Sequence, residues 1–334
     1  MNDRPWVRIV IVTHNSGRFT QNCVDALARQ TDQLFEVVIV DNMSTDGEVE
    51  RLSLPDKRFS VIFSTDNSGF SGGSNLGLKG AKTPYVMTLN ADAFLSPNCL
   101  LALRDATESF PEEHMFSPIL FKPGAGQVLD GAGDHFSIFG LGWRNGVGRP
   151  ISEYASILID TPEVFGATGA AALYRRDVFE KLGGFDERFF CYIEDVDLAF
   201  RIRARGGRCR LIPQADGVHI GGHSSNEIPG FAITQTVRNN LILIVSSAPL
   251  ILLPIMFVLH LAAHIKFQSK NKRTEIAEIR KRSFSKAIRH LPKILFQRFS
   301  RRPYPLGASF RIASSLSWSI RDVKTRPLKL LREK

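Results

Sequence analysis

Carboxylates gather within residues 186–197, in a stretch rich in aromatic and apolar residues, and four of them are candidates for chemistry: Asp186, Glu194, Asp195 and Asp197. Burial among apolar side chains raises the pKa of a carboxyl group and makes it a better proton acceptor, so this cluster could supply a general base. One acid could instead cap a helix, and others could pair with Arg201 and Arg203. Because capping needs only one acid, we favour a catalytic function for the cluster.

A second set of polar residues suits a divalent cation. The strand-like run 85–89 stops abruptly at Asn90-Ala-Asp92, and a carboxylate at the end of a strand in an open α/β sheet can hold a metal. A simple turn would explain the same residues. Farther along, His219 and His223 lie among glycine and serine. An imidazole paired with a distant Asp forms a mixed nitrogen and oxygen metal site, although a histidine is often structural.

These residues need a scaffold that brings them together. Residues 7–12 and 36–40 are β-branched runs, and residues 19–30 between them carry apolar side chains at helical spacing. Further apolar runs at 60–63 and 85–89 continue the alternation. Such alternation predicts an α/β fold with a mostly parallel, Rossmann-like sheet and helices on both faces.

Polar residues follow the first two of these strands, at the edge where open sheets bind ligands. One set ends at Asn15, and the other begins at Asp41, which could accept the ring N–H of a uracil or thymine base or could hold a turn. The glycine-rich run 67–77 would let the backbone approach a sugar or diphosphate closely, since glycine has no Cβ. It is not the G-x-G-x-x-G fingerprint, which weakens a nicotinamide-binding interpretation.

Composition and charge bound the class of protein. A chain of 334 residues with 43% hydrophobic content can bury a sizeable core. Four cysteines without paired metal spacing, and no secretory signal, indicate a reducing cytosolic setting. Residues 266–334 carry 20 Lys and Arg against 4 Asp and Glu, so the positive charge lies in the tail. The 25 residues before it, 241–265, contain no Asp, Glu, Lys or Arg and are long enough to cross a bilayer.

Taken in order, the motifs resemble the inverting family 2 glycosyltransferases of the GT-A fold, and within them the bacterial rhamnosyltransferase-like members that build cell-wall or O-antigen polysaccharide. The likeness covers about residues 7–225. It is carried by Val-Thr-His-Asn15, Val-Asp-Asn-Met-Ser-Thr-Asp46, Asn-Ser-Gly-Phe-Ser-Gly-Gly-Ser-Asn75, Leu-Asn-Ala-Asp92, Gly-Gly-Phe-Asp186, Glu-Asp-Val-Asp-Leu198 and Val-His219. The resemblance implies a catalytic domain over 1–235, with a donor half at about 1–95 and an acceptor half at about 96–235. Residues 236–334 would form an apolar segment and a basic helical tail that associate with the membrane.

The resemblance also implies roles for single residues. The nucleotide-sugar donor would be bound by Thr13, Asn15, Asp41, Asp66, Asn67, Gly69, Asn75 and Asn90. The family's D-x-D motif reads Asn90-Ala-Asp92 here, which leaves Asp92 as the main acidic ligand of Mg²⁺ or Mn²⁺, with His219 completing the site. Asp195 would be the catalytic base, supported by Glu194 or Asp197.

The implied reaction moves a sugar, rhamnose from a dTDP donor, to a lipid-linked or polysaccharide acceptor in cell-envelope glycan synthesis, with inversion in a single displacement. The same fold could use a UDP- or GDP-sugar. A different class of function is a non-catalytic protein whose basic tail binds nucleic acid. The tail contains no recognisable nucleic-acid module, and it directly follows an apolar run, so anionic lipid is the simpler partner and no nucleic acid is expected.

The apolar segment 241–265 poses a topological conflict. A single crossing with the basic tail in the cytoplasm would put the catalytic region outside, away from cytosolic nucleotide sugar. Pro249 and Pro254 each lack a backbone donor, so the segment could bend back, lie within one leaflet, or form a buried helical hairpin on the catalytic domain. We predict a peripheral or monotopic protein on the cytoplasmic face of the inner membrane, held by this segment and by Lys and Arg.

Overall fold

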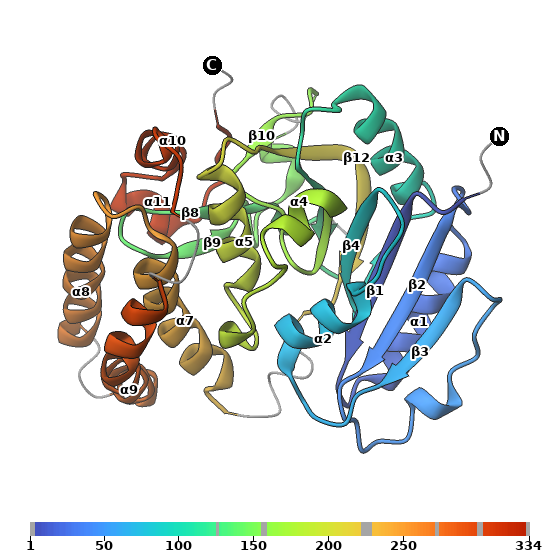
Figure 1. The fold of residues 1–334 in the computed structure, drawn as a ribbon, viewed down its shortest axis with the longest axis horizontal. Helices are drawn as coiled ribbons and strands as arrows, with labels where there is room; N and C mark the ends of the chain where they lie inside the picture. The colour runs from blue at the N-terminus through green and yellow to red at the C-terminus, as the bar shows by residue number, and fades with distance from the viewer. Residues whose placement is uncertain are drawn as a thin grey trace.

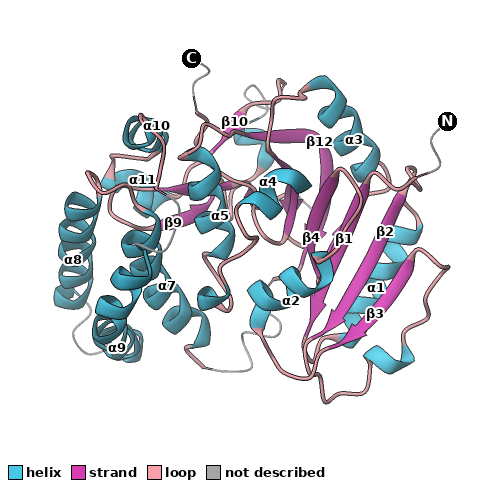
Figure 2. Cartoon of the chain, viewed as in Figure 1, coloured by secondary structure: helices cyan, strands magenta, loops and turns pink. Residues whose placement is uncertain are grey.

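A large sheet occupies one part of the molecule. Helices formed by the C-terminal part of the chain lie together at the other end of the molecule, away from the N-terminal strands (Figures 1 and 2). The computed structural model describes residues 4–124, 127–154, 159–221, 229–270, 274–298 and 303–331.

The first part of the chain alternates strands and helices, as the sequence predicts. Its elements are β1 (Val7–Thr13), α1 (Gly17–Ala28), β2 (Phe35–Asp41), a 3-10 turn η1 (Val49–Arg51), β3 (Phe59–Phe63), α2 (Gly69–Leu78) and β4 (Tyr85–Asn90). Strand β1 pairs in parallel with β2 and β4, and β2 pairs in parallel with β3. Thr13 is in register with Asp41, and Val12 with Asn90, so the polar residues after these strands meet at one edge.

Successive residues of β1 point into two different cores, because side chains alternate along a strand. Ile9 and Ile11 are buried with α1 and with α3 (Cys99–Ser109). Val10 is buried on the opposite face, in a core that includes side chains of α2, α4 (Arg176–Lys181) and α5 (Glu194–Arg203). Helices therefore cover both faces of the sheet, as predicted (Figure 1).

The second part of the sheet is mixed, which corrects the predicted mostly parallel arrangement. Its strands are β5 (Ala93–Leu95), β6 (Met115–Phe121), β7 (Leu129–Ala132), β10 (Glu163–Val164), β11 (Ala171–Arg175) and β12 (Cys209–His219). Strand β11 lies between β4 and β6 and is antiparallel to both, whereas β6 and β12 are parallel. In the described part of the chain, the strand order is β10-β12-β6-β11-β4-β1-β2-β3, with β5 on β12 and β7 on β6.

The residues between β6 and β11 explain the reversal. Parallel neighbours need a long crossover, usually a helix. Where described, this connection instead holds β7, β10, a two-stranded sheet of β8 (Asp134–Phe136) and β9 (Gly142–Arg144), and a 3-10 turn η2 (Ile151–Tyr154). Without a crossover helix, β11 enters the sheet in the opposite direction. The expectation of parallel strands came from the first four strands and holds for them, and among the later pairs it holds for β6 and β12 but not for β11.

The apolar segment 241–265 divides between two helices, α7 (Phe231–Ser247) and α8 (Leu253–Lys270). The C-terminal half of α7 is buried in the core, from Leu241 to Val245. Pro249 lies in the connecting turn, and Pro254 is the second residue of α8, where its missing N–H breaks no helical hydrogen bond. The segment is therefore a helical hairpin, one of the alternatives that the sequence left open.

Three more helices complete this group: α9 (Glu275–Arg298), α10 (Ala308–Ser315) and α11 (Ile320–Thr325). Among the helices described here, none combines the length and the apolar character needed to cross a bilayer. Residues after α10 also contact the strand-rich part of the chain through isolated β-bridges, which pair Ser317 with Ser137 and Leu331 with Glu163. The predicted domain boundary at residue 235 falls inside α7 and stays a prediction.

Candidate active site

Asp195, the predicted base, lies in the first turn of α5 and remains partly exposed. Its two carboxylate oxygens accept hydrogen bonds from the backbone N–H groups of Gly169 and Val196, each at 2.7 Å. A Cβ at position 169 would lie 3.0 Å from Asp195 Oδ2, so glycine permits this close approach. The carboxylate is thus held in one orientation by the backbone, with part of its surface open to a substrate.

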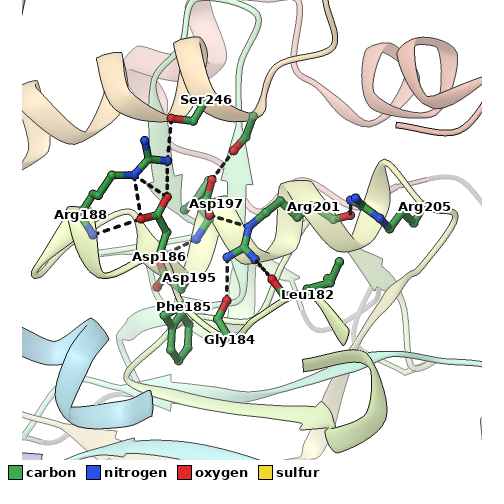
Figure 3. Close-up of polar contacts among 12 residues, drawn as sticks. Leu182, Gly184, Phe185, Asp186, Arg188, Asp195, Asp197, Arg201, Arg205 and Ser246 are labelled. Atoms are coloured by element: carbon green, nitrogen blue, oxygen red, sulfur yellow. Dashed lines mark hydrogen bonds and ion pairs between the residues drawn. The ribbon is translucent and has the colours of Figure 1, made fainter. Parts of the chain in front are cut away.

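The other acids of the cluster are less accessible. Glu194 is buried, and burial together with the neighbouring Asp195 charge raises its pKa well above the usual range. The same two causes raise the pKa of Asp134, on β8. In both groups, burial and the nearby charge favour the protonated form. Asp186 pairs with Arg188 at 2.6 Å (Figure 3).

Asp197 is fully buried and makes structural contacts. It forms an ion pair with Arg201 at 2.7 Å, and it accepts a hydrogen bond from the Ser247 hydroxyl of α7. Arg201 in turn donates to the carbonyls of Leu182 and Gly184, which precede the acid cluster (Figure 3). These bonds fix α5 against its neighbours, so they position Asp195 indirectly. Asp195 is the acid of this cluster that is free to meet an acceptor.

Asp92 and His219, the predicted metal ligands, lie side by side. Asp92 follows β4, and His219 is the last residue of β12, where it is in register with Ala93. Asp92 Oδ1 is 3.2 Å from His219 Nε2. Adjacent ligands of an octahedral cation with bonds of about 2.1 Å are separated by roughly 3 Å, so this pair fits Mg²⁺ or Mn²⁺. The Asn90 amide nitrogen also lies 3.2 Å from Nε2.

A second carboxylate orients the histidine from its other side. Asp130, at the start of β7, lies 2.7 Å from His219 Nδ1 and forms an ion pair with Arg144. Burial alone would lower the pKa of His219, but hydrogen bonds to Asp130 and Asp92 outweigh it and raise the pKa. The raised pKa favours the protonated ring, which donates from Nδ1 to Asp130 and from Nε2 to Asp92. A cation at Asp92 would take the place of the Nε2 proton, and Asp130 would hold the ring with its Nε2 lone pair toward that cation, as in metal-binding histidines.

One short backbone segment joins the metal pair to the base. The Asn90 N–H donates to the Ala170 carbonyl at 2.9 Å, and the N–H of the preceding Gly169 donates to Asp195. Strand β4, which leads to Asp92, and helix α5, which carries the base, are therefore bonded to adjacent residues.

In the described ranges, no group of three or more His, Cys, Asp or Glu side chains is placed to hold a metal ion.

The predicted donor residues of β1 and β2 lie together at the carboxyl edge of the sheet. Thr13 is buried, and its carbonyl accepts the Asn42 N–H at 2.9 Å. The Asp41 carboxylate accepts the Ser44 N–H at 3.2 Å, which is the turn contact considered from the sequence. The Asn15 N–H donates to the Ser44 hydroxyl at 3.0 Å. The loops after both strands are thus bonded into one polar surface.

Asn42, which sequence reasoning did not select, organises the glycine-rich loop. Its amide nitrogen donates to Asn67 Oδ1 and to the Gly69 carbonyl, both at 3.0 Å. Gly69 has a φ of +69°, and a Cβ there would lie 2.4 Å from the Phe190 carbonyl oxygen. Only glycine allows this contact, which brings the loop against the segment that precedes Asp195.

Two other predicted donor residues have different surroundings. Both ends of the Asn75 amide bind the backbone of Phe185 at 2.9 Å, which ties α2 to the Gly-Gly-Phe-Asp turn. Asp66 is exposed, and its carbonyl accepts the Ser64 hydroxyl. Contacts of the eight donor residues with a nucleotide sugar stay predictions. His223 lies outside the described residues.

Comparison with known proteins identifies the family. The model for glycosyl transferase family 2 matches residues 8–183, more than half of the chain. The chain belongs to this family. The match includes β1 to β4, the glycine-rich loop and Asp92, and it ends just before the acid cluster.

Curated relatives match a larger share of this glycosyl transferase than the family model does. The N-acetylglucosaminyl-diphospho-decaprenol L-rhamnosyltransferase of Mycobacterium tuberculosis is 26% identical over 240 residues, which cover 66% of this chain and 78% of that protein. The O-antigen chain rhamnosyltransferase RfbN of Salmonella typhimurium is 28% identical over 227 residues, covering 67% and 68%. A crystal structure of GalNAc-T7 with UDP, GalNAc and Mn²⁺ superposes with a TM-score of 0.61 at 17% identity, over 91% of this chain and 59% of that one. This last likeness shows a shared mixed α/β, GT-A-like fold.

Replacing Asp130 by Asn should weaken metal binding to this glycosyl transferase by about 10- to 100-fold, because the amide no longer fixes the ring and proton of His219. The measurement is calorimetric titration with Mn²⁺ in the presence of dTDP. Asp32→Asn is a matched control. Asp32 is also buried and accepts a hydrogen bond from Trp6, but it lies just before the start of β2, whereas His219 lies at the carboxyl edge of the sheet. Equal affinities for the wild type and the Asp130 variant would leave Asp130 without a positioning role.

Proposed function

We propose that this protein is a metal-dependent, inverting glycosyltransferase that moves rhamnose from dTDP-rhamnose to a lipid-linked or polysaccharide acceptor in cell-envelope glycan synthesis. The observation that supports the proposal is the Asp92–His219 pair at the end of β4, together with the backbone hydrogen bonds that link β4 and Asp195 to the adjacent residues 170 and 169. The names of the curated relatives support the choice of sugar and acceptor.

Each residue has a distinct part in the proposed reaction. Asp195 accepts the proton of the acceptor hydroxyl as that oxygen attacks the anomeric carbon from the face opposite the diphosphate. A cation held by Asp92 and His219 would neutralise negative charge on the leaving diphosphate. Two protein ligands leave the other octahedral positions for phosphate oxygens and water. A single displacement inverts the configuration at the anomeric carbon.

A donor screen with the purified protein tests this proposal. It offers dTDP-rhamnose, UDP-hexoses and GDP-hexoses with Mn²⁺ and a prenyl-diphosphate-linked GlcNAc acceptor, and it scores the released nucleotide diphosphate. We expect release of dTDP alone, and a product of inverted configuration by NMR. Release of UDP or GDP instead would change the donor. No release from any donor would favour a non-catalytic binding protein.

We also propose that α8 places the protein on the cytoplasmic face of the inner membrane. Exposed apolar side chains recur every three or four residues from the turn before this helix, at Ile251, and along the helix itself, at Ile255, Val258, Ala262 and Ile265. Ile251 is 74% exposed and Val258 62%. Exposed Lys266 and Lys270 follow on the same helix, and α8 lies at the outer edge of the molecule (Figure 1). An apolar stripe flanked by cations suits shallow insertion among anionic lipids.

Changing Ile251, Ile255 and Val258 together to Ser should lower binding to vesicles of anionic phospholipid on the order of a hundredfold, because it removes apolar area that would enter the lipid. Cosedimentation with vesicles measures this. Phe63→Ser provides the control, since Phe63 is also an exposed apolar residue but lies on β3. If the triple variant binds vesicles as the wild type does, the membrane contact lies elsewhere.

A further inference from the structure

A pocket with a strongly basic wall lies between α7, α9 and the 3-10 turn η3 (Glu187–Phe189). Its volume is about 270 Å³, and its polar lining comes from Arg188, Arg238, His290, Lys293 and Gln297. No carboxylate is among the described residues that line it. Liquid water occupies about 30 Å³ per molecule, so the space would hold several waters or one diphosphate group.

The two arginines of this pocket differ in how their charge is balanced. Arg188 donates to Asp186 and also to Ser246, so its charge is paired within the protein (Figure 3). Arg238 donates only to Asn239 Oδ1, at 2.8 Å, and forms no ion pair within the described residues. Burial and the neighbouring Arg188 cation lower the pKa of Arg238, and the Asp186 carboxylate, which is paired with Arg188, offsets this only in part. A half-buried guanidinium in such surroundings is stabilised by an incoming anion.

A second hollow in the molecule provides a contrast. It measures about 380 Å³ and lies along α2 and α4, with Lys79, Arg176, Glu180 and Glu187 in its wall. There, Arg176 is bonded to Glu180 at 2.9 Å, so opposite charges already balance. The basic wall at Arg238 is therefore a local property of the α7 and α9 pocket.

The rest of the pocket wall is apolar. Ile242, Ala287 and Ile294 line it together with the cations. A guanidinium binds phosphate oxygens in pairs, and the apolar part suits hydrocarbon attached to the phosphate. This combination fits a prenyl diphosphate better than a free sugar phosphate.

The pocket also adjoins the catalytic segment. Asn239, the neighbour of Arg238, is buried and donates to the carbonyls of Phe189, Cys191 and Tyr192 at 2.7–2.8 Å. These residues lead directly into the first turn of α5, where Asp195 lies. An anion at Arg238 would therefore be bound next to the chain segment that carries the base.

We infer that this pocket binds the diphosphate group of a prenyl-linked acceptor, with Arg238 as its main anchor and Lys293 as a second contact from α9. The inference rests on the proposed transfer to a lipid-linked acceptor. Helices α7 and α9 would then bind the prenyl diphosphate of the acceptor rather than its sugar.

Binding of farnesyl diphosphate to the full chain tests the inference, with EDTA present so that no metal draws the probe to Asp92 and His219. Arg238→Gln should weaken binding by about 10- to 100-fold, as expected for the loss of charge-assisted hydrogen bonds. Lys293→Gln, at an exposed position that tolerates exchange, should weaken it by a smaller factor. Arg282→Gln is the control, because Arg282 is 83% exposed on the same helix and does not line the pocket.

Two further probes test whether the pocket recognises diphosphate alone or diphosphate together with its prenyl chain. Inorganic diphosphate should bind more weakly than farnesyl diphosphate, and farnesol should not depend on Arg238. Equal binding of inorganic and farnesyl diphosphate would overturn the lipid assignment, and unchanged binding by the Arg238 and Lys293 variants would overturn the site. Binding of dTDP with Mn²⁺ is measured in parallel on the same variants. Normal dTDP binding with no farnesyl diphosphate binding defeats this inference alone, whereas absent dTDP binding counts against the proposed function.

Discussion

Transfer by the Asp195→Asn variant should fall by about 10²- to 10⁴-fold, the usual contribution of a general base. The amide keeps the shape of the carboxylate, and its oxygen can still accept the Gly169 N–H, while the hydrogen bond from the Val196 N–H is lost, so urea unfolding should show only a small loss of stability. What disappears is the ability to take the acceptor proton. The loss should therefore appear in kcat, measured as release of dTDP in the presence of acceptor, while calorimetric donor binding stays near the wild-type value.

The neighbouring acids provide the comparison for this variant. Burial and the Asp195 charge raise the pKa of Glu194 and favour its protonated form, which Gln resembles, so Glu194→Gln should retain most of the activity. Asp197→Asn breaks a buried ion pair with Arg201 and should act through stability, at a cost of about 3–5 kcal/mol. Urea unfolding separates that effect from catalysis. Near wild-type turnover by the Asp195 variant would move the role of base to one of these acids.

The parallel part of the fold could be predicted because its signals are local. Each strand from β1 to β4 is a short apolar run followed by polar or glycine-rich residues, and such runs need no distant partner to be recognised. The direction of β11 could not be predicted in this way. Its sequence is that of a buried strand in either direction, and the direction follows from the connection between β6 and β11.

The same distinction applies to the candidate site. Asp92, His219 and Asp195 occur in recognisable motifs, whereas Asp130 is a single acid among glycine and alanine that approaches His219 only because β7 pairs with β6. Arg238 is a lone cation in α7, and the pocket exists because α9 packs beside it. For residues 241–265, apolar composition alone could not show that α7 is buried while α8 keeps an exposed apolar side. The burial of α7 follows from the core that surrounds it.

The Asp92→Asn variant should lose transfer by on the order of 10³-fold, because a bound cation contributes several kcal/mol to the stabilisation of a departing diphosphate. The D-x-D motif already has Asn90 in its first position, so Asp92 supplies the only carboxylate of that motif. Its pKa is lowered, since hydrogen bonds from His219 and a charged His219 outweigh burial, and the carboxylate is ionised at neutral pH. Asparagine would leave His219 as the remaining predicted protein ligand.

Metal affinity itself should be weak without donor, because Asp92 and His219, the predicted protein ligands, would fill only two of the six positions that Mg²⁺ or Mn²⁺ prefers. Titration with Mn²⁺ should therefore show weak binding to the protein alone and much tighter binding once dTDP-rhamnose supplies phosphate oxygens. Asp92→Asn should abolish the tighter phase, whereas Asp195→Asn should retain it, since that carboxylate meets the acceptor. Tight Mn²⁺ binding without donor would contradict a metal site that the substrate completes. Full transfer in excess chelator would show that the chemistry at Asp195 does not depend on a metal at Asp92.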